Sequence, residues 1–487
     1  MKKINLLWIL AFLLLPIGKG FAQQLHLVTP NNSLLLSAQE GRELKLLYYG
    51  SKLTEVDRNN LWEATSATHA AYPVYGLNCP SESALAVVHA DGNMTLQMIV
   101  DKVSTTEDND ATIAKIVLKD KAYPFYVNVC YKAYKGVDVI ETWTEISHAE
   151  KKSVTLNRFA SAYLPLRRGD VWLSHLHGSW ANESNLAQEP LKPGVKMIKN
   201  KDGVRNSHTA HAEVMFSLDG KPQENLGNTI GAALCYSGNY KLFIDTDDSE
   251  YHHFYAGINE ENSEYHLKKG ETFVTPALAL TYSQEGLSGC SRNFHRWGRT
   301  YKLAHGNTPR KILLNSWEGV YFDINETGMN QMMEDIASMG GELFVMDDGW
   351  FGDKYKRASD NSSLGDWVVD TQKLPGGIAK LVSDAKKHGI RFGIWIEPEM
   401  TNTTSELYEK HPDWVVQAPK RDLVLGRGGT QLVLDLANPL VQDFMFHMVD
   451  TLMTNNPEID YIKWDANMGI MNHGSNYLTM DNQSHDS

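Results

Sequence analysis

Residues 311–350 read KILLNSWEGVYFDINETGMNQMMEDIASMGGELFVMDDGW, and this stretch decides the fold of the second part of the chain. The apolar runs Ile312–Trp317 and Leu343–Met346 each predict a buried strand. Between them, Asn325 can cap a helix that runs to about Met339, where two glycines would end it. This order of strand, helix and strand predicts two parallel strands joined by a covering helix.

The alternation of strand and helix continues towards residue 464. Apolar side chains recur at i, i+3, i+4 and i+7 over residues 378–385, which predicts an amphipathic helix, and Phe392–Ile396 predicts a third strand. Asn438 and Pro439 begin another helix, and Tyr461–Trp464 predicts a fourth strand. Such a pattern fits half of a doubly wound sheet or half of an eight-stranded barrel. The first strand has no glycine-rich phosphate loop after it, which counts against nucleotide binding.

The preceding part of the chain, from Gln24 to about Ser283, predicts β structure. Short apolar or alternating runs recur there, separated by Gly, Asn, Asp and Pro. The clearest runs are Leu44–Tyr49, Ala84–His89, Leu96–Val100, Tyr126–Tyr131, Val139–Ile146, Leu242–Asp245 and Ala277–Tyr282. Many strands without long helical patterns imply a large antiparallel sandwich. Phe294, Trp297 and Tyr301 then fall on one stripe of a helix that would connect the two parts.

The composition is that of an ordinary globular protein and argues against some partners. The formal net charge is −13 and no basic patch stands out, so nucleic acid and anionic membrane surfaces are not expected partners. The cysteines, Cys79, Cys130, Cys235 and Cys290, match no metal-binding spacing. We therefore expect neither a zinc site nor a disulfide on which function depends. Cys130 and Cys235 lie in strand-like runs, where cysteine is often a small buried hydrophobe.

Residues 1–22 have the pattern of a secretory signal peptide. Lys2 and Lys3 precede the apolar run Ile4–Ile17, and a small residue, Ala22, stands before the expected cleavage point. The run is shorter than the roughly 20 apolar residues that a spanning helix needs, which disfavours the alternative of a retained membrane anchor. We expect export to a periplasm or to the outside of the cell, with no membrane contact after cleavage.

Each of the predicted parallel strands ends in a cluster of polar and aromatic residues. The clusters are Asn315–Glu318, Asp347–Trp350, Trp395–Glu399 and Lys463–Asn467. In a barrel these carboxyl ends converge on one mouth, where active sites lie, so the clusters favour a barrel. Strand ends are polar loops in any protein, which explains one such cluster but not the same chemistry in all of them. Carboxylates that each lie near a Trp predict a pocket for a neutral polyol, whose hydroxyls would bind the carboxylates while the Trp stacks on the ring.

The last cluster suggests a catalytic group. Hydrolysis of a glycosidic bond needs two carboxyl groups, one to protonate the leaving oxygen and one to attack the anomeric carbon or to activate water. Asp465 suits the role of nucleophile. Lys463 lies two residues earlier on the same strand, so both side chains face the same side, and its cation would help to keep Asp465 ionised. The alternative is a purely structural ion pair inside the barrel.

The chain resembles glycoside hydrolase family 36, the bacterial α-galactosidases. In the second part, the motifs that carry the resemblance are Asn315–Glu318, Tyr321–Asp323, Phe344–Gly352, Leu364–Trp367, Lys373–Pro375, Phe392–Met400, His411–Trp414, Gln431–Leu436 and Ile462–Asp465. Tyr72–Gly76 and Gly178–Glu183 agree more loosely in the first part. The resemblance implies a multidomain β plus α/β fold. A β-supersandwich (residues 23–285) and a connecting helix (286–308) would precede an incomplete (β/α)8 TIM-type barrel (309–487).

The resemblance also implies an activity and a site. It implies retaining hydrolysis of terminal α-linked galactose from oligosaccharides of the melibiose and raffinose type, with Asp465 as nucleophile and without a metal or organic cofactor. The residues implied to bind or surround the galactose are Trp317, Asp347, Asp348, Trp367, Trp395, Arg427, Lys463 and Asn467. Arg427 departs from the family spacing, because Gly428, Gly429 and Thr430 stand before Gln431, and we expect a bulge there that still delivers Arg427.

The family's acid/base Asp comes from a later strand than any predicted here, and a barrel needs eight strands. We therefore expect this chain alone to lack the acid/base residue and to be inactive, as a fragment or the product of a broken frame. Two alternatives stay open. One is a galactose-binding relic without catalysis, and the other is an α-N-acetylgalactosaminidase or a transgalactosylase of the same fold. A homo-oligomer of the full-length form also stays open.

Overall fold

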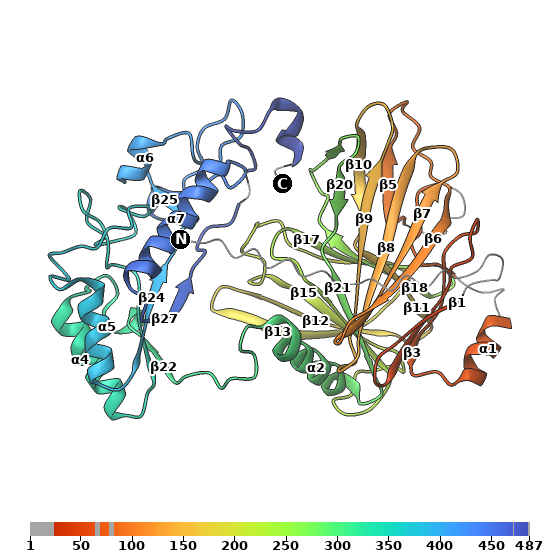
Figure 1. Ribbon diagram of the computed structural model, residues 1–487, viewed down its shortest axis with the longest axis horizontal. Helices are drawn as coiled ribbons and strands as arrows, with labels where there is room; N and C mark the ends of the chain where they lie inside the picture. The colour runs from red at the N-terminus through yellow and green to blue at the C-terminus, as the bar shows by residue number, and fades with distance from the viewer. Residues whose placement is uncertain (1–23, 64–68, 77–81, 471, 486–487) are drawn as a thin grey trace, which may run out of the picture.

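The computed structural model describes residues 24–63, 69–76, 82–470 and 472–485. The predicted signal peptide, residues 1–22, lies outside the described residues. Among the helices in the described ranges, none has the length and apolar character needed to cross a membrane. The chain forms two lobes, which Figure 1 shows side by side, with the β-rich lobe on the right and the α/β lobe on the left.

The β-rich lobe consists of antiparallel sheets. The largest has the order β13-β12-β15-β16-β21-β9-β8-β7-β6, and β20 also pairs with β9. Its strands are β6 (Met98–Glu107), β7 (Ala111–Asp120), β8 (Phe125–Tyr134), β9 (Ile140–His148), β12 (Trp172–Ser179), β13 (Asn182–Pro190), β15 (Ala210–Ser217), β16 (Thr229–Leu234), β20 (Thr272–Val274) and β21 (Leu278–Ser283).

Three smaller sheets complete this lobe, with the orders β1-β2-β3-β4, β19-β10-β5 and β11-β18-β17-β14. Their strands are β1 (Gln24–Val28), β2 (Asn32–Ser37), β3 (Lys45–Ser51), β4 (His69–Ala70), β5 (Leu85–Val88), β10 (Val154–Phe159), β11 (Ala162–Arg168), β14 (Gly194–Lys199), β17 (Tyr240–Thr246), β18 (Tyr251–Ile258) and β19 (Tyr265–Leu267). A helix, α1 (Glu55–Glu63), follows β3.

Alternation of side chains explains why these strands pack face to face. In β17, Tyr240, Leu242 and Ile244 are buried, whereas the residues between them are partly exposed. Successive side chains of a strand point to opposite faces, so each strand of this kind gives one apolar face to the core. Two buried clusters fill the space between the sheets, one around Ile116 and Val127 and one around Phe216 and Leu242.

A helix lies against the β-sandwich where the chain leaves it. Helix α2 (Gly286–Trp297) continues as a π-helix over Gly298–Lys302. Phe294, Trp297 and Tyr301 pack together with Tyr134 of β8, and the Tyr134 and Tyr301 ring centroids are 4.5 Å apart. The apolar stripe seen in the sequence therefore packs against the sandwich, and the chain crosses to the second lobe after it (Figure 1).

The second lobe is built on a parallel sheet with the order β22-β23-β24-β27. Its strands are β22 (Leu313–Asn315), β23 (Leu343–Met346), β24 (Arg391–Ile396) and β27 (Ile459–Trp464), and a small antiparallel sheet of β25 (Met400–Asn402) and β26 (Gln431–Val433) lies beside it. The helices are α3 (Trp317–Val320), α4 (Glu326–Ser338), α5 (Gly377–Lys387), α6 (Glu406–Lys410) and α7 (Pro439–Asn455). Short 3-10 turns cover Arg427–Gly429 and Met480–His485.

The order of these strands decides between the two parallel architectures. Each described parallel strand lies next to the one that precedes it in the chain, without the reversal of order that defines a doubly wound sheet. Sequential order is the arrangement of a barrel. The first strand is shorter than predicted, because Ser316 turns the chain and Trp317 begins α3. Leu313, the first residue of β22, and Ile312, which precedes it, are exposed rather than buried.

Replacing Asn325 by Ala is expected to lower the free energy of unfolding by about 1 kcal/mol. Asn325 has an extended backbone before α4, and its Oδ1 accepts the Gly328 N–H at 2.8 Å. Alanine leaves that N–H without its cap. Urea unfolding followed by circular dichroism measures the change, and Asn325→Ser, which can still cap, should stay close to the parent. Equal losses in both variants would contradict the capping role.

The cysteines that the structure describes are unpaired. Cys130 and Cys290 are buried, whereas Cys235 is exposed. The expectation that Cys235 is a buried hydrophobe is wrong, because it stands just beyond the end of β16 rather than within the strand. Cys79 lies outside the described residues.

Candidate active site

Side chains from three parallel strands meet at the carboxyl end of the barrel sheet. Asp347 directly follows β23, and its Oδ2 accepts hydrogen bonds from Asn315 Nδ2 at 2.6 Å and from Lys463 Nζ at 2.8 Å. Asp347 is only 2% exposed. A carboxylate so far from water needs a countercharge, and the Lys463 ammonium provides it. The predicted convergence of these strand ends is therefore present.

Asp465 follows β27 and is held by N–H donors. Its Oδ2 accepts from Trp395 Nε1 at 3.0 Å and from Asn467 Nδ2 at 2.7 Å, and its Oδ1 accepts from the Ala466 N–H at 3.0 Å. Lys463 was expected to support Asp465, but its ammonium hydrogen bonds to Asp347 instead. These donors fix the plane of the Asp465 carboxylate.

Asp348 is held by an arginine, Arg357, that is not among the site residues predicted from the sequence. Arg357 donates from Nε to Asp348 Oδ1 at 2.9 Å and from Nη2 to Oδ2 at 2.7 Å. Arg357 is 1% exposed, and the rings of Phe322 and Phe351 lie 5.3 and 5.7 Å from its guanidinium carbon. Burial raises the pKa of Asp348, and the Arg357 charge opposes that shift. Only the need of a buried carboxylate for a partner could have indicated Arg357, which lies in a loop between two family motifs.

Arg427 is linked to the Asp348–Arg357 pair only through Asp360. Its Nη1 donates to Asp360 Oδ1 at 3.1 Å, and the same oxygen lies 3.7 Å from Arg357 Nη2. Gly428 and Gly429, with φ of 65° and 69°, form the turn that brings the exposed Arg427 to this position. Left-handed backbone is easily adopted by glycine, so the extra residues form a local bulge. Arg427 therefore contacts Asp360, and not Asp348 itself.

The tryptophans of the site play different structural parts. Trp317 is partly exposed, and its ring meets those of Tyr321 and Phe322 edge to face. Trp395, implied as a pocket wall, is 1% exposed, so it offers its indole N–H to Asp465 rather than an open ring face. Trp367 is partly buried, and its ring centroid lies 6.1 Å from that of Trp395. Of these rings, Trp317 and Trp367 keep some exposed surface, whereas Trp395 has almost none.

Two further residues contact the turn that follows Asp465. Glu397 Oε1 accepts the Asn467 N–H at 2.6 Å, and Arg205 of the β-rich lobe donates from Nη1 to the Asn467 carbonyl oxygen at 3.2 Å. Nearby, the Ile470 N–H donates to the Asp202 carbonyl oxygen at 3.1 Å. Glu397 belongs to one of the polar clusters predicted at the strand ends, but Arg205 lies in the other lobe, and no motif in the sequence marks it.

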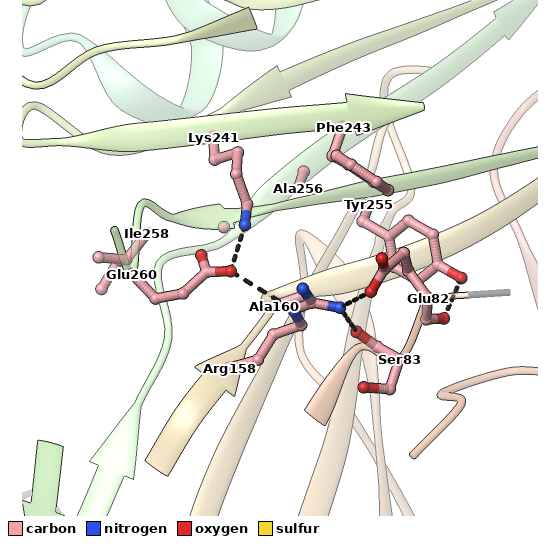
Figure 2. Close-up of a pocket in the computed structure, with 11 residues that line it drawn as sticks. Glu82, Ser83, Arg158, Ala160, Lys241, Phe243, Tyr255, Ala256, Ile258 and Glu260 are labelled. Carbon is pink, nitrogen blue, oxygen red and sulfur yellow. Dashed lines mark hydrogen bonds and ion pairs between the residues drawn. The ribbon is translucent and has the colours of Figure 1, made fainter. Parts of the chain in front are cut away.

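A separate cavity lies within the β-rich lobe (Figure 2). Arg158 pairs there with Glu82 and Glu260, and Lys241 also pairs with Glu260. These charged side chains therefore form ion pairs with one another. The cavity lies in the sandwich, away from the strand ends described above. Within the described ranges, no group of three or more His, Cys, Asp or Glu residues could hold a metal ion.

Comparisons with known proteins agree with this architecture. Residues 42–268 match the Glycosyl hydrolase family 36 N-terminal domain, and residues 272–487 match the Melibiase family. The chain is 30% identical to the α-galactosidase AgaB from Geobacillus stearothermophilus, with a TM-score of 0.86 over 96% of this chain and 68% of that one. The chain belongs to glycoside hydrolase family 36. This confirms the predicted family and fold class, a β-supersandwich followed by a barrel domain.

Other relatives share parts of the chain. It is 34% identical to the probable α-galactosidase C of Aspergillus flavus, over 74% of this chain and 49% of that protein. A variant of AgaA from Geobacillus stearothermophilus, solved in complex with raffinose, is 29% identical with a TM-score of 0.86, over 95% of this chain and 68% of that one. The chain spans about half the length of the first curated relatives that it matches.

Proposed function

We propose that the protein containing this chain is a retaining α-galactosidase in which Asp465 is the nucleophile. The observation that carries the proposal is the Asp465 carboxylate, held by three N–H donors at the strand ends where Asp347 and Lys463 also converge. Family membership supports the activity, and the raffinose complex of AgaA supports an oligosaccharide as substrate.

The contacts at these strand ends support a proposal for the first half of a retaining reaction. The Asp347–Lys463 pair and the Asp348–Arg357 pair offer fixed carboxylate oxygens and an ammonium group to the hydroxyls of a galactose ring. Asp465 then attacks the anomeric carbon, which passes through an oxocarbenium-like transition state to a covalent galactosyl ester. A second carboxyl group protonates the leaving oxygen and later activates water, and the family resemblance assigns that group to a later strand.

Hydrolysis of p-nitrophenyl α-galactoside and raffinose by the longest product of the gene tests the proposal. Proton NMR of the first product should show α-galactose, because two displacements at one carbon retain its configuration. p-Nitrophenyl α-glucoside, which differs at C4, should react far more slowly. Preference for the N-acetylgalactosaminide would instead favour the α-N-acetylgalactosaminidase alternative, and transfer to added sugar would favour a transgalactosylase. Galactose binding without turnover of any substrate would favour a relic.

We also propose that the protein is exported, which rests on the charged and apolar pattern of residues 1–22. Mass spectrometry of the protein purified from its native host should find a mature chain that begins at Gln23. A chain that retains Met1 would contradict export by this route. Light scattering of the same sample gives the number of subunits and tests the homo-oligomer that stayed open.

A further inference from the structure

We propose that Glu397 is a positioning residue for Asp465, because its carboxyl group holds the backbone of the turn that carries the nucleophile. This inference rests on the proposed role of Asp465. Glu397 follows β24 and Asp465 follows β27, and these two strands are parallel neighbours.

The last two residues of β24 and Glu397, which follows them, each contact the turn Asp465–Asn467 (the nucleophile turn) through a different group. Trp395 donates its indole N–H to Asp465 Oδ2 at 3.0 Å. The Ile396 carbonyl oxygen accepts the Asp465 N–H at 2.9 Å. Glu397 Oε1 accepts the Asn467 N–H at 2.6 Å. The segment therefore fixes the side chain, the backbone and the far end of the turn together.

The hydrogen bond from the Asn467 N–H to Glu397 matters because Asn467 and Ala466 also donate hydrogen bonds to the Asp465 carboxylate. The Asn467 side chain donates to Asp465 Oδ2 at 2.7 Å, and the Ala466 N–H donates to Oδ1 at 3.0 Å. If the Asn467 backbone moves, its side-chain amide can no longer donate to Asp465 Oδ2 with the same geometry. Glu397 thus acts on the nucleophile through Asn467 and does not itself need to touch the substrate.

The surroundings of Glu397 favour an uncharged acceptor. Glu397 is 1% exposed, and burial is the main cause that raises its pKa to about 7, with the negative charges of Asp465 and Asp348 acting in the same direction. The Asn467 hydrogen bond and the Arg357 charge oppose the shift. Below about pH 7 the carboxyl group is therefore mostly protonated, and glutamine reproduces both its shape and its carbonyl acceptor.

Two substitutions of Glu397, made in the longest product of the gene, test whether its hydrogen-bond acceptor is what positions Asp465. Glu397→Ala removes the acceptor, and we expect kcat on p-nitrophenyl α-galactoside to fall by about 10- to 100-fold with KM changed less than about threefold, since a misplaced reacting group slows chemistry without removing the galactose contacts. Glu397→Gln keeps the acceptor and should restore kcat to within about threefold of the parent at pH 6.

Glu150→Ala is the matched control. Glu150 is also a buried glutamate that accepts a backbone N–H, from Ala90 at 3.0 Å, but it lies in the β-rich lobe. Its loss should affect stability and leave kcat per folded molecule unchanged. Unchanged kcat in Glu397→Ala, or equal losses in the Ala and Gln variants, would overturn the positioning role. A parent enzyme that is inactive on every galactoside would refute the proposed function instead, so the two failures are distinct.

Discussion

Asp465→Ala is expected to reduce kcat on p-nitrophenyl α-galactoside by about 10⁴-fold or more, which is the scale found when a nucleophilic or triad residue is removed. The covalent ester cannot form without the carboxylate, and the remaining groups only bind and polarise the substrate. Asp347 and Lys463, which we propose to bind galactose, keep their hydrogen bond in this variant, so the dissociation constant for galactose should change far less than kcat. Steady-state kinetics and calorimetric titration with galactose measure the two quantities.

The control for this experiment is Asp460→Ala, in strand β27, which Asp465 directly follows. Asp460 is exposed, and its nearest cation, Lys311, lies 3.8 Å away. Its loss should leave kcat within about twofold, because exposed ion pairs contribute little. A fall of less than about tenfold in Asp465→Ala would show that another group performs the attack and that the role proposed for Asp465 is wrong.

The second large effect is expected on stability. Arg357→Leu should lower the free energy of unfolding by about 3–5 kcal/mol, because it leaves the Asp348 carboxylate buried without its bidentate partner. Urea unfolding at pH 7 measures the loss. Arg427→Leu, which removes an exposed arginine whose side chain is 45% accessible, should cost about 1 kcal/mol or less. Arg357→Lys should be intermediate, since it keeps the charge without the two-pronged geometry.

The pH dependence of that loss has a defined sign. Burial raises the pKa of Asp348, and removal of Arg357 takes away the charge that opposes this shift. A carboxyl group whose pKa is higher in the folded state contributes stability at low pH, and this contribution is lost as pH rises above its unfolded pKa. The deficit of Arg357→Leu should therefore shrink towards pH 4. The double variant Arg357→Leu/Asp348→Asn should be more stable than the single variant at pH 7. A constant deficit would indicate lost packing instead.

Local signals in the sequence predicted the parallel sheet well. The start of α4 follows from Asn325 and the run after it, and Leu343–Met346 is a strand with the predicted bounds, because an unbroken apolar run between a helix and a polar cluster has few other solutions. The β-rich lobe was predicted less completely. Strand β13 (Asn182–Pro190) stands at the edge of its sheet and is mostly exposed, so it carries no alternation to recognise.

The sequence located the carboxylates of the site but not the residues that hydrogen bond to them. Strand ends located Asp347, Asp348 and Asp465, because in parallel sheets these ends share one edge. Spacing along one strand gives only the face of a side chain, so it could not show that Lys463 hydrogen bonds across the sheet to Asp347. Arg357 lies in an irregular loop, and the burial of Glu397 depends on a neighbouring strand far away in the sequence. These hydrogen-bond partners and this burial depend on residues that only folding brings together.

The contacts of Arg205 with Asn467 and of Asp202 with Ile470 bear on how such proteins can be recombined. A chimera that joins the β-rich lobe of one relative to the barrel of another brings together a loop and a strand-end turn that were never selected together. Exchange of the whole lobe should therefore succeed best when residues 200–208 are inherited with the barrel that they touch. For the same reason, a mutant library aimed at turnover should include this loop, although it lies about 260 residues upstream of Asp465.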